Sequence, residues 1–163
     1  MAPEVLRGNR YTQAVDIYSF GIVAYEIVSG LPPYHQLAHN DFLALKICLG
    51  LRPELNNIKL PQLLKDLINR CLDADPLIRP TASELCEILN GWYNEVMARK
   101  DTEFYSQYIE IKKAEKFNKK SNDVTSHPQA IYTSRLLTFK NLPEPQNSKE
   151  INYQFYAEYS KSL

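Results

Sequence analysis

Two opposite charges stand where a buried ion pair could form. Glu4 lies between Ala-Pro and Val-Leu, and Arg79 lies between Ile78 and Pro80. Because an unpaired charge among apolar residues and prolines is costly to bury, these side chains fit their surroundings if they meet in the fold. Taken from composition alone, both could equally be ordinary surface charges. The first interpretation requires two distant segments of the chain to lie side by side.

The cysteines and glycines offer little further chemistry. Cys48, Cys71 and Cys86 are odd in number and lack the Cys-x-x-Cys or Cys/His spacing of a metal site. Each lies among apolar residues in a helix-like stretch, which indicates buried, reduced thiols of an intracellular protein. The five glycines form no Gly-x-Gly-x-x-Gly loop that could cradle phosphates. We therefore assign no catalytic, metal-binding or cofactor-binding residue.

Length and charge limit the architecture and the partners. With 163 residues the chain can form one domain with a core, but a two-lobed enzyme would need more. The 19 basic and 19 acidic residues leave no net charge, which argues against nucleic-acid binding and a basic membrane-surface patch. The sequence has no signal-peptide pattern and no apolar run of membrane-spanning length. We expect a cytoplasmic protein without nucleic-acid or membrane partners.

Apolar residues recur at helical spacing before residue 100, where no useful alternating strand pattern occurs. Four helices are predicted, over residues 16–29, 39–49, 61–72 and 81–97. The first is apolar around nearly its whole circumference, so we expect it to be buried on all sides, with Asp16 as a candidate N-cap and Gly30 after its end. The fourth begins with Thr81-Ala82-Ser83-Glu84, which has the spacing of a capping box. The unit is predicted to be all-α.

From residue 100 the composition shifts to Lys, Asn, Ser, Gln and Glu with scattered Tyr. Residues 101–120 could continue as a polar helix, whereas 116–126 is typical of a linker. Residues 130–139 could form a short extended or helical piece, and Leu-Pro-Glu-Pro at 142–145 predicts a rigid turn or polyproline segment. We expect a helical domain over residues 1–99 and a polar, largely disordered tail over residues 100–163.

Several short motifs follow one another at characteristic spacing. They are Met1-Ala2-Pro3-Glu4-Val5-Leu6, Tyr11-Thr12-Gln13-Ala14-Val15-Asp16-Ile17-Tyr18-Ser19-Phe20-Gly21, Tyr25-Glu26, Gly30-Leu31-Pro32-Pro33-Tyr34, Cys71-Leu72-Asp73 and Asp75-Pro76-Leu77-Ile78-Arg79-Pro80-Thr81. Ala-Pro-Glu alone is a weak signal, but the series in register resembles the C-terminal lobe of a protein kinase catalytic domain. The amino-acid sequence of these motifs is most similar to that of the tyrosine-kinase-like group of Ser/Thr kinases. The resemblance covers residues 1–97 and implies the helical C-lobe portion of the kinase fold.

The resemblance implies structural roles for three charged residues. Glu4 of Ala-Pro-Glu would pair with Arg79, as the corresponding glutamate and a distant arginine do in the family. Asp16 would accept hydrogen bonds from the backbone of the catalytic loop and hold that loop against the central helix. Both roles concern the architecture of the lobe and leave the chemistry to other segments.

Three further positions on the first predicted helix match the family. Val23 and Ile27 would lie on the face that supports the apolar spine reaching toward the adenine pocket. Glu26 matches a position that in some kinases contacts basic side chains of a peptide substrate. A solvated or locally paired glutamate is the alternative interpretation of Glu26.

The resemblance also implies what the sequence lacks. Phosphoryl transfer in the family uses a Gly-rich loop, a strand lysine paired with a helix glutamate, a catalytic-loop aspartate and an aspartate that binds Mg²⁺. All of these precede Ala-Pro-Glu in the family, and neither His-Arg-Asp nor Asp-Phe-Gly occurs here. We therefore expect this chain to bind no cofactor and to be inactive alone, whereas a complete parent kinase would use MgATP. A gene model or transcript that starts at an internal methionine is the simplest account.

Two functions are compatible with the sequence. One is a piece of a kinase whose parent phosphorylates Ser/Thr hydroxyls in signal transduction, with Tyr hydroxyls as the less favoured alternative. The other is a non-catalytic helical interaction module derived from a kinase. The expected partners are a protein substrate or regulatory protein and the N-terminal part of a kinase domain. Because the family covers the remaining face of the 16–29 helix with segments that precede Ala-Pro-Glu, we expect this chain alone to be poorly folded.

Overall fold

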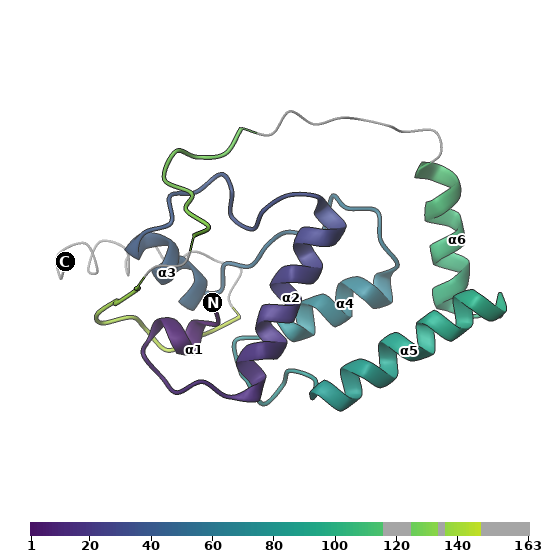
Figure 1. The fold of residues 1–163 in the computed structure, drawn as a ribbon, viewed down its shortest axis with the longest axis horizontal. Helices are drawn as coiled ribbons and strands as arrows, with labels where there is room; N and C mark the ends of the chain where they lie inside the picture. Colours follow the sequence, from purple (N-terminus) through teal and green to yellow (C-terminus); the bar gives the residue numbers. More distant parts are fainter. Residues whose placement is uncertain (116–124, 134–135, 148–163) are drawn as a thin grey trace.

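A computed structural model describes residues 1–115, 125–133 and 136–147. The described residues contain helices and no strand, which confirms the all-α prediction. In chain order the helices are α1 (Pro3–Leu6), α2 (Gln13–Ser29), α3 (Asp41–Cys48), α4 (Gln62–Cys71), α5 (Ala82–Ala98) and α6 (Glu103–Glu115). Helix α2 runs through the middle of the molecule, with α4 against it, α1 and α3 together on one side, and α5 and α6 on the other (Figure 1).

The beginning of α2 differs from the prediction. The helix starts at Gln13, three residues before the expected start, and its N-cap is Thr12, whose side chain makes no capping hydrogen bond. Asp16 lies exposed in the first helical turn, so its interpretation as the N-cap is wrong. A carboxylate in that turn still interacts favourably with the positive end of the helix dipole. The other end is as predicted, because Gly30 adopts a left-handed conformation and its N–H donates to the carbonyl of Glu26.

Side chains cap two other helices. The predicted capping box of α5 is present: the Thr81 hydroxyl accepts from the Glu84 N–H at 3.2 Å, and the Glu84 carboxylate accepts from the Thr81 N–H at 2.8 Å. The backbone hydrogen bond from Thr81 lowers the pKa of the Glu84 carboxyl group. Helix α3 begins two residues after the predicted start because Asn40 caps it by accepting from the Leu43 N–H.

The apolar core is built around α2 and α4. Tyr18 of α2 packs with Ile68 of α4 and the adjoining Leu72, and all three side chains are almost fully buried. A second cluster joins α1 to α3 through Leu6 and Leu43. A third cluster brings α5 against α2 and α4, and its members are Ile17, Leu67, Cys71 and Leu85. These clusters hold segments from both ends of the 1–99 region in one unit.

One face of α2 remains open. Val23 is 52% exposed and Ile27 is 76% exposed, so the described chain does not bury this helix on all sides. The resemblance predicts that segments preceding Ala-Pro-Glu cover this remaining face in a complete kinase domain. Val23 and Ile27 are one helical turn apart and therefore lie on the same face. The described part of the chain covers α2 on the faces that meet α1, α4 and α5 and leaves this apolar face to solvent.

The cysteines are free, and only two are buried. Cys48 and Cys71 lie in the core, where burial raises the pKa of each thiol to about 11 and keeps it protonated near neutral pH. Cys86 is exposed on α5, so the expectation of three buried thiols is wrong for this residue. The apolar neighbours of Cys86 in sequence lie on other faces of the helix.

The described residues after position 100 pack on the helical unit. Part of the predicted polar helix is present as α6, and Phe104 stacks on Trp92 of α5 with ring centroids 4.4 Å apart. Residues 125–133 and 136–147 form neither helix nor strand and lie beside α3 and α1 (Figure 1). The remaining tail positions, 116–124, 134–135 and 148–163, lie outside the described residues, and with them part of the predicted linker and short piece.

Close packing between α2 and α4 yields a test of the fold. A Cβ added at Gly21 would approach Leu72 Cδ2 to 2.9 Å and Cys71 Cβ to 3.0 Å, and both neighbours are buried. We expect Gly21→Ala to lower the free energy of unfolding by about 1–3 kcal/mol through overpacking. Urea denaturation followed by circular dichroism measures this change.

Gly91→Ala is the matched control because a Cβ at that α5 position meets nothing within 4 Å. It should leave stability unchanged or raise it by up to about 1 kcal/mol, the gain in helix propensity. Equal effects of the two substitutions would contradict the packing of α2 on α4.

Candidate functional site

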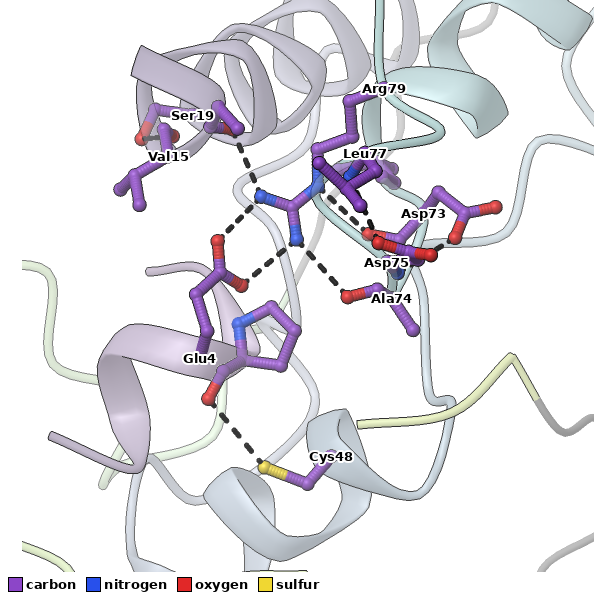
Figure 2. Close-up of polar contacts among 12 residues, drawn as sticks. Glu4, Val15, Ser19, Cys48, Asp73, Ala74, Asp75, Leu77 and Arg79 are labelled. Carbon is purple, nitrogen blue, oxygen red and sulfur yellow. Dashed lines mark hydrogen bonds and ion pairs between the residues drawn. The ribbon is translucent and has the colours of Figure 1, made fainter. Parts of the chain in front are cut away.

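The structure brings Glu4 and Arg79 together in the core, although they are 75 positions apart. Arg79 Nη1 donates to Glu4 Oε1 at 2.6 Å and Nη2 donates to Glu4 Oε2 at 2.9 Å, so the pair is bidentate. The side chains are 0% and 10% exposed for Arg79 and Glu4 respectively. Figure 2 shows the carboxylate on α1 facing the guanidinium, which reaches it from the turn between α4 and α5.

Backbone carbonyls satisfy the rest of the Arg79 guanidinium. Nε donates to the carbonyl of Asp73 at 2.9 Å, Nη1 to that of Ala14 at 2.9 Å, and Nη2 to that of Ala74 at 3.4 Å. Together with the two bonds to Glu4, each of the five guanidinium N–H groups has an acceptor. A buried ion pair is stable only when its remaining hydrogen-bonding groups are satisfied in this way. Arg79 thereby joins α1, the start of α2 and the α4–α5 turn.

The turn that presents Arg79 is held by its own aspartates. Asp73 accepts from the Asp75 N–H at 2.8 Å, and Asp75 accepts from the Leu77 N–H at 2.9 Å. Short acidic side chains often stabilise turns through such local bonds. The Asp73-Ala74-Asp75-Pro76 stretch therefore shapes the backbone that carries the guanidinium (Figure 2).

A second arginine, which is half-buried and which the sequence analysis missed, lies near the first. Arg52 Nε donates to the carbonyl of Leu72 at 2.6 Å, and Nη1 donates to those of Ile47 and Leu51 at 2.7 and 2.8 Å. Its guanidinium carbon and that of Arg79 lie 5.6 and 5.1 Å from the centroid of the Tyr18 ring. The sequence gives one indication of this role: Arg52 lies between Leu51 and Pro53, without another charged residue directly beside it.

Tyr18 is the aromatic centre of this arrangement. Its ring lies within cation–π distance of both guanidinium groups, an interaction that strengthens away from water. Burial raises the pKa of the Tyr18 hydroxyl, and the positive charge of Arg52 partly opposes that rise. Tyr18 is therefore a neutral contact for the two arginines near neutral pH.

The other predicted site residues share one side of α2. Asp16, Val23 and Ile27 recur at helical spacing along an exposed stripe, which we call the α2 stripe. Glu26 is exposed at the edge of this stripe. Burial and, next, the negative charge of Glu26 raise the pKa of Tyr132, so Glu26 lies near the 125–133 segment. The structure does not bring the α2 stripe to the Glu4–Arg79 pair.

The described ranges lack a metal site and a membrane-spanning helix. No cluster of three or more His, Cys, Asp or Glu side chains there is arranged to hold a metal ion. No helix in residues 1–115, 125–133 or 136–147 has the length and apolar character needed to cross a membrane. The charged groups of this site, Glu4 and Arg79, bind each other. The site therefore fixes the relative positions of α1, the start of α2 and the α4–α5 turn.

The Glu4–Arg79 pair yields a stability prediction. Glu4→Ala and Arg79→Ala should each lower the free energy of unfolding by about 3–5 kcal/mol, because each leaves a buried charge without its partner. A double-mutant cycle analysed by urea denaturation separates the pair interaction from other effects of each substitution.

Arg70→Ala is the control, because Arg70 forms an exposed ion pair with Glu84 at 3.4 Å. Its effect should be close to the error of the measurement, since exposed pairs contribute little. A coupling energy between Glu4 and Arg79 below about 0.5 kcal/mol would contradict the buried pair.

Known proteins share these motifs. The family model described as "Protein kinase domain" matches residues 1–89. The chain is 38% identical over 90 residues to mitogen-activated protein kinase kinase kinase 4 of Homo sapiens, which is 53% of this chain and 6% of that protein. It is also 38% identical over 91 residues to serine/threonine-protein kinase fray1 of Dictyostelium discoideum, which is 53% of this chain and 16% of that protein. This chain thus spans a small part of each relative.

A solved structure gives the same result for the fold. The cryo-EM structure of the AtMLKL3 tetramer matches with a TM-score of 0.53 and 31% sequence identity, over 69% of this chain and 22% of that chain. The matched family model covers more than half of the 163 residues and includes both members of the buried ion pair. The chain therefore belongs to the protein kinase domain family.

Proposed function

We propose that residues 1–99 are the helical C-lobe portion of a tyrosine-kinase-like Ser/Thr protein kinase domain. The complete domain would transfer the γ-phosphate of ATP to Ser/Thr hydroxyls of a protein substrate. The observation that carries this proposal is the bidentate, buried Glu4–Arg79 pair, formed by two motifs that stand in kinase register. The relatives named as Ser/Thr kinases support Ser/Thr hydroxyls over Tyr hydroxyls as acceptors.

The α2 stripe is the surface that would meet the rest of a kinase domain. Val23 and Ile27 are apolar and exposed, which suits support of the apolar spine, and Asp16 is exposed where it could accept backbone N–H groups of a catalytic loop. An apolar face on a central helix is stable when another element covers it. The N-terminal part of a kinase domain is the partner that fits this face.

In this proposal the groups for the chemical step come from other segments of a kinase domain. Transfer of a phosphoryl group needs donors around the ATP phosphates, a base for the acceptor hydroxyl and ligands for Mg²⁺. The sequence has neither His-Arg-Asp nor Asp-Phe-Gly, and its glycines form no phosphate-binding loop. In this proposal the chain contributes architecture and, through Glu26, a contact to basic substrate side chains. Its setting would be signal transduction in the cytoplasm.

The proposal predicts that the purified chain does not bind MgATP. We expect no change in thermal unfolding temperature at millimolar MgATP, because a ligand stabilises a protein only by binding its folded state. Differential scanning fluorimetry measures this, and a chain containing the complete kinase domain is the positive control. Saturable binding at micromolar MgATP would overturn the assignment of the chain as a partial site.

The α2 stripe yields a second prediction. If the stripe is a contact surface for the rest of a kinase domain, the chain alone should bind hydrophobic dye and self-associate through it. Ile27→Gln should reduce both, as measured by dye fluorescence and by size-exclusion chromatography with light scattering. Leu77→Gln is the control, because Leu77 is exposed in the α4–α5 turn.

Equal effects of Ile27→Gln and Leu77→Gln would count against this role of the stripe. A monomeric chain with little dye binding would favour the alternative function, a non-catalytic interaction module derived from a kinase. The observation that favours the alternative is that residues 125–133 and 136–147 add contacts of their own to the helical unit. A regulatory protein would then be the partner in place of a substrate.

A further inference from the structure

Residues 125–133 lie against the loop that connects α2 to α3 (Figure 1). The His127 N–H donates to the carbonyl of His35 at 2.7 Å, and the His39 N–H donates to the carbonyl of Gln129 at 2.9 Å. Each of the two segments therefore gives one backbone donor and one backbone acceptor to the other. Because both bonds join backbone groups, the side chains decide what else strengthens or weakens the contact.

Two side chains add to this contact. His39 Nδ1 donates to the carbonyl of Ile131 at 2.9 Å. The Tyr132 hydroxyl donates to the carbonyl of Pro33 at 3.1 Å. The Tyr132 ring also meets the His39 ring edge to face, with centroids 4.8 Å apart. Tyr132 thus contacts the α2–α3 loop through both its hydroxyl group and its ring.

The surroundings of the Tyr132 hydroxyl group disfavour negative charge. The hydroxyl faces the carbonyl oxygen of Pro33, which can only accept a hydrogen bond. Burial and, next, the negative charge of Glu26 raise the pKa of Tyr132, so this carboxylate acts on the same group. A phosphate ester at Tyr132 Oη would have no hydrogen to donate to Pro33 and would carry a charge of about −1.5 to −2. Loss of the hydrogen bond and repulsion from Glu26 both oppose that arrangement.

Tyr132 is accessible in spite of these contacts. The residue is 50% exposed, and its hydroxyl group is bonded to the loop at the Pro33 carbonyl. A rotation of the ring that breaks this bond brings the hydroxyl group into solvent. A modifying enzyme could therefore reach Tyr132 Oη without unfolding the helical unit.

We propose that Tyr132 is a tyrosine-phosphorylation site and that its phosphorylation detaches residues 125–133 from the α2–α3 loop. The phosphoryl donor is MgATP, and the catalyst is a separate tyrosine-specific protein kinase. A bond forms between Tyr132 Oη and the γ-phosphorus of ATP while the bond from that phosphorus to the bridging oxygen breaks. ADP leaves, and the hydroxyl proton passes to a base of the modifying enzyme. The phosphate acts on a contact within this chain, whether or not the chain is part of an active kinase domain.

Detachment would remove one wall of a cavity. Ile131 and Tyr132 line a cavity of about 390 Å³ together with Ile22 of α2, Tyr34 of the loop and Leu43 of α3. These lining side chains are largely apolar, so residues 125–133 keep part of the surface between α2 and α3 from water. Phosphorylation at one hydroxyl group would thereby expose apolar side chains on two helices, a local change in charge with a wider structural effect.

The experiment uses the full 163-residue chain with phosphotyrosine placed at position 132 during translation. Hydrogen exchange measured by NMR reports on the His39 and His127 amides, which both donate across the contact. We expect these two amides to exchange roughly tenfold or more faster than in the unmodified chain, because the phosphate opposes the contact. Tyr132→Phe removes the hydroxyl group without adding charge, so it should accelerate the same amides only about two- to fivefold.

Phosphotyrosine at position 93 is the matched control, because Tyr93 is 61% exposed on α5. It should leave the His39 and His127 amides unchanged. The Leu72 amide, which donates to the Ile68 carbonyl in the core, should keep its protection in every sample. This amide separates local detachment from general unfolding of the chain.

Access to the site is measured on the unmodified chain with MgATP and a tyrosine kinase of broad specificity. Mass spectrometry should find phosphate on Tyr132 as well as on Tyr93, since both are exposed. Phosphate on Tyr93 without phosphate on Tyr132 would overturn the proposal.

Three results of the exchange measurement would also overturn it. One is equal exchange of the His39 and His127 amides with and without phosphate at position 132. The second is an equal effect of phosphate at positions 93 and 132. The third is loss of protection at Leu72 on phosphorylation of Tyr132, or unprotected His39 and His127 amides in the unmodified chain, because neither is compatible with a contact that the phosphate releases locally.

Discussion

The buried hydrogen bonds of the Arg79 guanidinium are the interaction on which the rest of the structure depends. Its five N–H groups bind the Glu4 carboxylate and the carbonyls of Asp73, Ala14 and Ala74. Burial of a charge costs several kcal/mol unless all of these bonds form together, so the pair requires three segments to be in place at once. Such a contact adds little net stability, but it specifies how α1 sits on the α2–α4 core.

Helices and their ends could be predicted to the extent that local signals determine them. Apolar periodicity located α2, α4 and α5, and the capping box at Thr81 is local chemistry that needs no tertiary context. The start of α2 was predicted late because Thr12 gives no side-chain cap, and the first turn is held by contacts that include the Ala14 carbonyl on Arg79. The pairing of Glu4 with Arg79 was suggested by burial cost together with motif register, and Arg52, which lacks a distant opposite charge, was missed.

The packing of residues 136–147 could not be predicted because their polar composition hides a few specific contacts. Arg7 and Glu144 are 137 positions apart, and no periodic pattern relates them. Leu142 is a single leucine among Asn, Pro and Glu, so hydrophobic periodicity carries no signal there. A segment of this kind gains its conformation from the surface that it meets, which is why composition alone indicated a tail.

The helical unit has two apolar surfaces, one on the α1–α3 side and one on α2. Each is stabilised when another segment removes it from water, but the described chain covers only the first. On the α1–α3 side, Leu142 and Phe139 of the chain itself cover the apolar cluster. On α2, Val23 and Ile27 meet solvent, and no segment within the described ranges covers them. Removing apolar area from water contributes about 25 cal/mol per Å², so covering a few hundred Å² is worth several kcal/mol, comparable to the stability of a whole domain. The α2 stripe is therefore the place where a further part of a kinase domain would contribute most. Leu142 and Phe139 already make that contribution at the cluster of α1 and α3.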